Sequence, residues 1–212
     1  MRRLDHNFKM TPADAIIDLY ERRANDWTSD RGLASPDRPP FEAPWLDRFV
    51  ELLRGSEILD VGCGSGDPIA RYILEKGLAL TGIDASPSLI DICKGKFPHC
   101  DWIAADMRGL DLARTFDGIL VWHSMIHLTP EDQVRTFPVL RRHARSGTIL
   151  MFTSGHSHGE VIGQWRGEPL YHGSLDPNEY AALLLASGFD LVDMWLNDPA
   201  CGHATVWLAR AR

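Results

Sequence analysis

A glycine-rich turn is the first feature of this sequence whose residues could do chemistry. It follows an apolar stretch at residues 58–61 that predicts a strand, and it reads DVGCGSG at residues 60–66. Glycine lets the backbone turn tightly and approach a ligand closely, because no Cβ stands in the way. In doubly wound sheets, such a strand-to-helix junction is where a nucleotide binds. The residues predicted to form a binding site here are Asp60, Gly62, Cys63 and Gly64.

An acid at the end of the next predicted strand narrows the choice of ligand. Asp84 lies in the segment GIDAS at residues 82–86, where a carboxylate can accept hydrogen bonds from both hydroxyls of a ribose. A dinucleotide-binding turn would have a third glycine where Asp67 stands, and an acid at that helix N-terminus would repel a pyrophosphate. The phosphate-binding pattern GxxxxGK[ST] is absent from the sequence. The turn therefore favours a ligand without phosphates.

Several histidines follow predicted strands or lie in an insertion before the last helix. Substrates bind at the carboxyl ends of strands in open α/β sheets, and the pKa of imidazole suits a base that takes a proton from an O–H or N–H group. The histidines in these positions are His123, His127, His156, His158 and His172. We interpret His127 as a structural helix residue. The segment HSHGE at residues 156–160 could chelate a metal, but no third histidine is placed by spacing, so no metal site is predicted.

The elements that must position these residues alternate along the chain. Helices are predicted between most of a series of apolar strands, which lie at residues 58–61, 78–83, 102–103, 116–121, 148–153, 191–196 and 204–209. This alternation predicts an α/β fold with a doubly wound, mostly parallel sheet. The last two strands have no helix between them, so we expect them to pair as an antiparallel hairpin.

The first 55 residues differ from the rest of the chain. A helix is predicted to begin at Thr11 and Pro12, with an apolar face that runs to Trp27. Residues 28–44 are rich in Pro, Asp and Ser and predict a loop, and a second helical stripe follows at residues 45–53. We therefore expect a helical cap or lid at residues 1–55 and an α/β domain at residues 56–212. Residues 1–44 are expected to become ordered over bound ligands.

Residues 58–154 resemble the class I, Rossmann-like S-adenosylmethionine-dependent methyltransferases of the small-molecule type. The segments that carry the resemblance are, in order, DVGCGSG (60–66), GIDASPSLI (82–90), AADM (104–107) and FDGILVWHSMIHL (116–128). The resemblance implies a seven-stranded sheet with an antiparallel last strand. It also implies S-adenosylmethionine as the cofactor, with S-adenosylhomocysteine as the product.

The same resemblance implies roles for individual residues. Gly62 and Gly64 would approach the methionine part of the cofactor, and Asp84 would hold its ribose. The segment YERRANDW (20–27) is similar to the lid helix of many members, in which a tyrosine, here Tyr20, closes over the cofactor carboxylate. The remaining residues that the family pattern places around the cofactor are Ala85, Ser86, Asp106, Met107, Trp122 and His123.

Methyl transfer from a sulfonium is a direct displacement, so a protein must mainly align the nucleophile and exclude water. We expect His123 to be the catalytic base, with a pKa near the ordinary value of about 6.5, because in this family the end of the fourth strand faces the methyl group. The residues expected to contact the substrate are Trp165, Tyr171, His158 and His172.

The predicted reaction is methylation of an oxygen or nitrogen nucleophile on a small molecule. A nucleic-acid amino-methyltransferase is disfavoured, because VWHS at residues 121–124 stands where [DN]PP[YF] would be expected. The alternative from a different functional class is a non-catalytic module that binds S-adenosylmethionine or S-adenosylhomocysteine.

Composition limits the partners. The 22 Lys and Arg residues against 29 Asp and Glu give a net charge of −7, which disfavours nucleic acid as the main partner. The sequence has no run of 18 apolar residues, so no membrane span is predicted, and the first residues lack the apolar segment of a secretory signal. The 4 cysteines are irregularly spaced, which favours reduced thiols and a cytoplasmic location. We expect a monomer or a homodimer.

Overall fold

The computed structural model describes residues 12–31 and 40–212, and its centre is a seven-stranded sheet. The strands lie in the order β3-β2-β1-β4-β5-β9-β8, and β9 runs antiparallel to both of its neighbours. The predicted fold class and the antiparallel pairing of the last two strands are therefore confirmed. The strand bounds are β1 Glu57–Val61, β2 Ala79–Asp84, β3 Asp101–Ala104, β4 Phe116–Val121, β5 Ala144–Ser154, β8 Phe189–Asp198 and β9 Ala204–Ala211.

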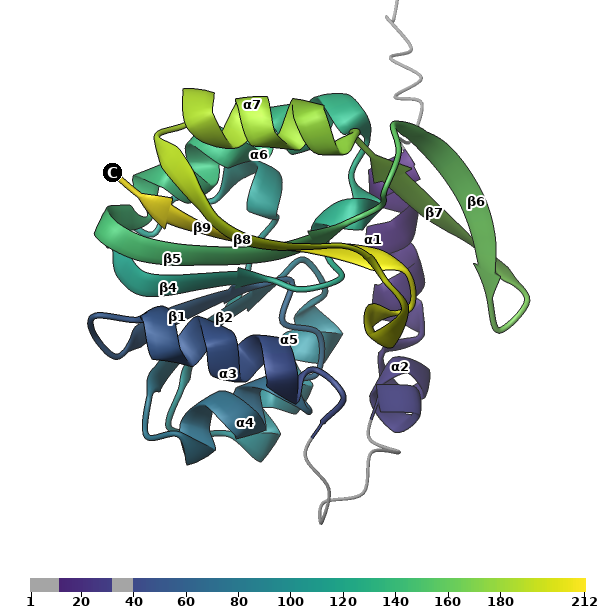
Figure 1. Cartoon of the computed structure of the whole chain (residues 1–212). Coiled ribbons are helices and arrows are strands. Elements are labelled where there is room, and N and C mark those ends of the chain that lie inside the picture. The colour runs from purple at the N-terminus through teal and green to yellow at the C-terminus, as the bar shows by residue number, and fades with distance from the viewer. Residues whose placement is uncertain (1–11, 32–39) are drawn as a thin grey trace, which may run out of the picture.

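Helices cover both faces of this sheet (Figure 1). One face carries α3 (Ala43–Leu52), α4 (Ile69–Glu75) and α5 (Pro87–Lys96), and the other carries α6 (Pro130–Arg142) and α7 (Pro177–Ala186). On the first face, Phe49 of α3 packs in one apolar cluster with Ile58 of β1. On the second face, Phe137 and Tyr180 pack around Phe152 of β5. The sheet is thus buried on both sides, which is why its strands are almost continuously apolar.

The sheet changes direction of growth between β1 and β4. The chain adds β2 and β3 on one side of β1, and then returns to add β4 and β5 on the other side. Ligands bind outside the carboxyl ends of the strands at such a switch point. The glycine turn follows β1 and His123 follows β4, so the strand order places both at this crevice.

Two helices lie across the carboxyl edge of the sheet. These are α1 (Pro12–Arg22) and α2 (Ala24–Arg31), and α1 packs through Ile16 and Leu19 onto β7. The structure divides the helix expected up to Trp27 into two pieces at Arg23 and continues it to Arg31, so the loop predicted from residue 28 begins later. Thr11, the predicted helix cap, and residues 32–39 of the predicted loop lie outside the described residues.

A second, two-stranded sheet occupies the insertion before α7. Its strands are β6 (Gly159–Trp165) and β7 (Glu168–Ser174), which form a hairpin beside α1 (Figure 1). No strands were predicted in this insertion from the sequence. The turn contains Arg166 and Gly167, both at positive φ (50° and 81°), as a two-residue hairpin turn requires. Gly167 was the sequence signal for this hairpin.

The remaining elements are short 3-10 helices near the ends of strands, namely η1 (Met107–Gly109), η2 (Met125–His127) and η3 (Pro199–Cys201). Within residues 12–31 and 40–212, none of the helices has both the length and the hydropathy needed to cross a lipid bilayer.

The capping box at the start of α7 offers a test of the fold. The Asp176 side chain accepts hydrogen bonds from the backbone N–H groups of Asn178 and Glu179, and the Glu179 side chain returns a bond to Asp176 N–H. We expect Asp176→Ala to lower the free energy of unfolding by about 1 kcal/mol, because these donors lose their partner. Urea unfolding measures the change. Asn178→Ala is the control, since only the backbone of Asn178 joins this cap; an equal loss in both variants would contradict the assignment.

Candidate functional site

A cavity of about 220 Å³ lies at the carboxyl ends of β1, β2 and β4, beneath α1 and α2. The cavity brings together every residue that the sequence analysis assigned to the cofactor. These residues are Tyr20, Asp60, Gly62, Cys63, Gly64, Asp84, Ala85, Ser86, Asp106, Met107, Trp122 and His123. Residues from five separate segments of the chain therefore share one enclosed space, as expected for a ligand site at a switch point.

Asp84 ties the glycine turn to the start of α5. Its Oδ2 accepts the Gly64 N–H and its Oδ1 accepts the Ser86 N–H, both at 2.9 Å. Gly64 has a φ of +57°, a conformation that glycine adopts without strain. Burial raises the pKa of Asp84, while the hydrogen bonds from the Ser86 and Gly64 backbones oppose that rise. Each carboxylate oxygen keeps a lone pair for a ligand hydroxyl.

Asp60 supplies a second carboxyl group to the cavity. It is 2% exposed, and burial raises its pKa to about 7, with a smaller contribution from the negative charge of Asp84. The Arg31 guanidinium acts in the opposite direction. A cationic ligand group beside Asp60 would lower this pKa and favour the carboxylate form. The position therefore suits an ammonium or a sulfonium.

Two residues of α2 line the cavity without having been assigned to it. The Trp27 Nε1 lies 3.0 Å from the point that a Cβ on Gly64 would occupy, so a larger residue there would displace the indole. Arg31 forms a 2.6 Å ion pair with the fully buried Glu42 and can also meet a ligand carboxylate in the cavity. Arg31 was missed because a loop was predicted from residue 28.

Asp106 is already engaged by protein partners. It caps η1 by accepting the Arg108 N–H at 2.9 Å, and the Arg108 guanidinium also binds its carboxylate. Arg108 Nη2 reaches Asp14 of α1 at 2.8 Å. Asp106 thus lies in the cavity wall as predicted, and through Arg108 it also helps to attach α1 to the rest of the structure.

His127 was interpreted as a structural residue, but it lines the cavity and contacts Tyr20. His127 Nδ1 lies 2.9 Å from the Tyr171 carbonyl oxygen, so Nδ1 carries the hydrogen and donates it. Nε2 is then free to accept the Tyr20 hydroxyl, which lies 3.1 Å away. Burial raises the pKa of Tyr20 and lowers that of His127 to about 4, so both side chains are neutral at neutral pH.

His123 is held by long-range contacts in an uncommon backbone conformation. Its φ is +48°, its backbone N–H donates to Thr153 Oγ1 at 2.8 Å, and its Nε2 lies 3.7 Å from Cys201 Sγ. Non-glycine residues in this region of backbone space cluster at functional sites. Burial, together with smaller contributions from the charges of Arg31 and the neighbouring histidines, lowers the pKa of His123 to about 4. The expected pKa of about 6.5 is therefore wrong.

A second hollow lies on the other side of His123. It is an open cleft of about 630 Å³ between the end of β5, the β6–β7 hairpin and the turn between β8 and β9. Five of the chain's nine histidines line it, namely His123, His156, His158, His172 and His203. Its described lining contains no Lys or Arg. Because His123 lines both hollows, a molecule in the cleft would lie close to a molecule in the cavity.

The predicted substrate residues are divided by the structure. His158 and His172 line the cleft, although His158 is also paired with Glu179 at 2.7 Å on its rim. Trp165 and Tyr171 line neither the cavity nor the cleft. Trp165 packs on Tyr20 and Trp27 of the N-terminal helices, and Tyr171 is buried against Ile16 and Leu19.

The HSHGE segment stays together, because all five of its residues line the cleft. His158 is also paired with Glu179 of α7. Across residues 12–31 and 40–212, no three His, Cys, Asp or Glu side chains gather as a group that could hold a metal ion.

The two buried histidines should make stability depend on pH. Between about pH 6.5 and 4 the unfolded chain protonates His127 while the folded chain does not, so stability is lost as the pH falls through this window. When the pH falls from 7.5 to 5, the free energy of unfolding should decrease in both proteins, and the decrease should be about 1–2 kcal/mol smaller in His127→Gln than in the unchanged chain. Denaturant titrations at both pH values measure this difference, and the exposed His99→Gln is the control. Equal pH dependence in all three proteins would contradict the buried, neutral state of His127.

Comparison with known sequences finds a family match in the central part of the chain. Residues 58–147 match the family described as "Methyltransferase domain". The ubiquinone biosynthesis O-methyltransferase of Coxiella burnetii (strain Dugway 5J108-111) is 34% identical over 92 residues, which are 40% of this chain and 38% of that protein. The magnesium-protoporphyrin O-methyltransferase of Rhodobacter capsulatus is 27% identical over 169 residues, 77% of this chain and 73% of that protein. The chain thus spans well under half the length of the first of these relatives.

Solved structures extend the likeness to almost the whole chain. The magnesium protoporphyrin IX methyltransferase of Synechocystis PCC 6803, crystallised with bound SAM, superposes with a TM-score of 0.71 at 14% identity, covering 97% of this chain and 100% of that one. At this identity the likeness establishes the fold. Residues 58–147 are therefore similar to a methyltransferase domain, and the chain as a whole shares its fold with this class I methyltransferase.

Proposed function

We propose that this protein is an S-adenosylmethionine-dependent methyltransferase that acts on a small molecule. One observation carries the proposal: three charged side chains, those of Asp84, Asp60 and Arg31, line the same cavity at the switch point. The Asp84 carboxylate is held in place by the Gly64 and Ser86 backbones. A ribose, an ammonium and a carboxylate each find a complementary group in this set. The methyltransferase family match supports the same assignment.

The cavity residues fit the parts of the cofactor in a definite way. Asp84 would accept the ribose hydroxyls, and Asp106 and Met107 would flank the adenine. Gly62 and Gly64 lack a Cβ where the methionine part would approach, and Arg31 would pair with its carboxylate. Asp60 would face its positive charge. A crystallised relative carries SAM and another form of the same protein carries SAH, which supports SAM as cofactor and SAH as product.

The histidine-lined cleft is the proposed site for the methyl acceptor. It adjoins the cavity at His123, and residues 154–159 give it backbone and hydroxyl groups for hydrogen bonding. Relatives and structural neighbours include a ubiquinone biosynthesis O-methyltransferase, a magnesium-protoporphyrin O-methyltransferase and a 1,6-didemethyltoxoflavin-N1-methyltransferase, which supports a small molecule with an oxygen or nitrogen acceptor as the substrate.

The chain's own residues would contribute alignment, exclusion of water and a base. The bound cofactor would supply an activated methyl group on sulfur. Tyr20 and Trp27 roof the cavity and keep solvent from it, while the cleft orients the acceptor's lone pair towards the cavity. His123 is neutral at neutral pH and can take the proton that an O–H or N–H acceptor releases. Tyr20, held by His127, is placed to contact the same region.

The proposal includes the cellular setting expected from the sequence. We propose a cytoplasmic protein that acts as a monomer or homodimer and does not take nucleic acid as its substrate. The four cysteines Cys63, Cys93, Cys100 and Cys201 are free thiols in the structure, which supports a reducing compartment. Gel filtration coupled to light scattering would determine the oligomeric state.

Binding of the cofactor is tested by removing the ribose partner. Asp84→Ala should weaken binding of S-adenosylhomocysteine by about 1.5–3 kcal/mol, because charge-assisted hydrogen bonds are lost. Isothermal titration calorimetry measures the dissociation constant, and Asp91→Ala on the exposed face of α5 is the matched control. An unchanged constant in Asp84→Ala would overturn the ribose assignment, and no binding by the unchanged chain would overturn the proposed function.

Catalysis is tested separately from binding. The protein is incubated with methyl-labelled S-adenosylmethionine and a metabolite extract, and the labelled product is identified; tight binding without any product would support the non-catalytic alternative.

Once the substrate is known, the role of His123 can be measured. His123→Asn should lower kcat by roughly 10²–10⁴-fold with little change in cofactor affinity. Because the pKa of His123 is about 4, we expect the base to contribute no change in rate between about pH 6 and 8. A near-unchanged kcat would show that alignment alone suffices.

A further inference from the structure

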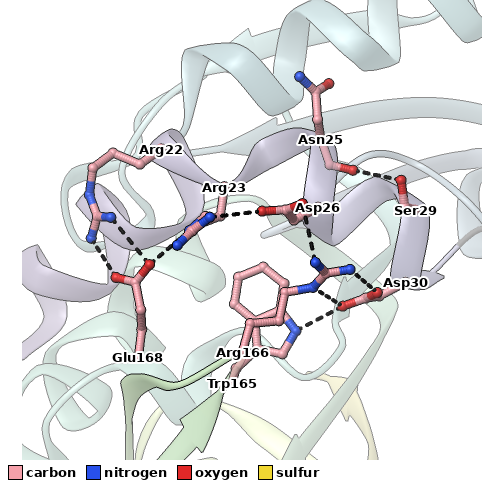
Figure 2. Close-up of polar contacts among 9 residues, drawn as sticks. All are labelled: Arg22, Arg23, Asn25, Asp26, Ser29, Asp30, Trp165, Arg166 and Glu168. Carbon is pink, nitrogen blue, oxygen red and sulfur yellow. Dashed lines mark hydrogen bonds and ion pairs between the residues drawn. The ribbon is translucent and has the colours of Figure 1, made fainter.

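The tip of the β6–β7 hairpin is bound to the N-terminal helices by charged side chains (Figure 2). Arg166, in the turn, forms ion pairs with Asp30 at 2.8 Å and with Asp26 at 3.3 Å, both on α2. These pairs join positions about 140 residues apart in the chain. They therefore depend entirely on the tertiary structure.

Glu168 makes a matching set of contacts at the start of β7 (Figure 2). Its carboxylate pairs with Arg22 at 2.9 Å and with Arg23 at 2.7 Å, at the end of α1 and the junction with α2. A positive residue of the hairpin thus meets acids of the helices, and a negative residue meets bases. Such two-way complementarity favours one alignment of hairpin and helices, because an alignment that placed Arg166 opposite Arg22 and Arg23 would bring like charges together.

Aromatic packing joins the same two parts. The Trp165 indole N–H donates to Asp30 at 3.0 Å, and its ring lies 6.0 Å from Tyr20 and 5.8 Å from Trp27. Tyr20 and Trp27 are the aromatic residues that roof the cavity. The hairpin tip is therefore in direct contact with the roof, from the side opposite the cavity.

The N-terminal helices are also bound to other parts of the structure. Glu21 of α1 accepts hydrogen bonds from Ser86 and Ser88 at the start of α5, and Arg108 pairs with Asp14. These contacts hold α1. Among the described ion pairs that join α2 to other elements, Asp26 and Asp30 bind the tip and Arg31 binds Glu42 at the far end of the helix; α2 also contacts α5.

We propose that Arg166 and Glu168 are positioning residues for the cofactor, which hold α1 and α2 closed over the cavity and slow exchange of the ligand beneath them. The inference rests on the proposed function. The two residues act through Tyr20, Trp27 and Arg31, which line the cavity, and do not line it themselves. Separation of the helices from the tip would widen the way out for a ligand under this roof, so the ion pairs would oppose its dissociation.

The arrangement separates the two ligands kinetically. The histidine-lined cleft lies along the base of the hairpin, at residues 159–161 and 172–174. The contacts of residues 165–168 with α1 and α2, here called the clasp, lie at the tip of the hairpin. Opening the clasp therefore affects the cofactor and leaves the acceptor cleft in place. We expect variants at the tip to raise the KM for S-adenosylmethionine with little change in kcat at saturating cofactor.

The test measures dissociation of labelled S-adenosylhomocysteine, chased with an excess of unlabelled ligand, from Arg166→Gln, Glu168→Gln and the double variant. Each ion pair is partly exposed, so we expect a roughly two- to fivefold faster dissociation for each single variant and a larger effect for the double one. Raising the salt concentration should accelerate release from the unchanged chain more than from the double variant. Asp190→Asn, which removes an exposed pair with Arg212 at the far end of β8, is the control and should change nothing.

Hydrogen exchange of residues 20–31 without any ligand provides a second reading. If the clasp holds the helices, these residues should exchange faster in the double variant than in the unchanged chain. A chain that carries both Arg166→Asp and Asp30→Arg keeps this ion pair with its charges exchanged, so we expect it to exchange more slowly than the double variant. Unchanged dissociation and unchanged exchange in folded variants would overturn the inference. If the unchanged chain binds no S-adenosylhomocysteine, the proposed function fails, and with it the role of the clasp in cofactor exchange, whatever the exchange data show about the helices.

Discussion

The Asp84 carboxylate is the group on which the geometry of the cavity depends. One oxygen accepts the Gly64 N–H and the other accepts the Ser86 N–H, so one side chain at the end of β2 joins the turn after β1 to the start of α5. These bonds are strengthened by the low dielectric of a buried site. The positive φ of Gly64 directs its N–H towards Asp84, and the absence of a Cβ leaves room for the Trp27 indole above. Turn, strand end and roof thus depend on each other.

Burial also determines the charges inside this site. It raises the pKa of Asp60 to about 7 and lowers those of His123 and His127 to about 4. Two neutral imidazoles therefore face the cavity at neutral pH, and they do not repel a cationic ligand. A ligand with a positive charge would instead meet Asp60, whose ionised form it would stabilise. The same desolvation that costs stability at low pH prepares the site for the proposed cofactor.

The β6–β7 hairpin connects the two parts of the proposed active site. Its base lines the acceptor cleft through His172, and its tip holds α1 and α2 through Arg166 and Glu168. Tyr171, between these ends, is buried against α1, and its carbonyl orients His127. One element therefore contributes to both parts, with its base in the cleft and its tip against the roof. This element lies outside the seven-stranded sheet, so it can differ between relatives without disturbing the fold.

The sequence by itself determined the features that are local in the chain. The strands of the seven-stranded sheet and the glycine turn, with Asp84 twenty residues after Gly64, depend on patterns within a few residues or one strand–helix unit, and they appear in the structure where they were predicted. Only the tertiary structure decided the rest. The Tyr20–His127 contact joins residues 107 positions apart in the sequence, and the Arg166–Asp30 pair joins residues 136 positions apart. A local sequence pattern cannot indicate that residues so far apart in the chain will meet. The pKa of His123 also depended on the tertiary structure, because burial by distant segments sets the cost of charging an imidazole.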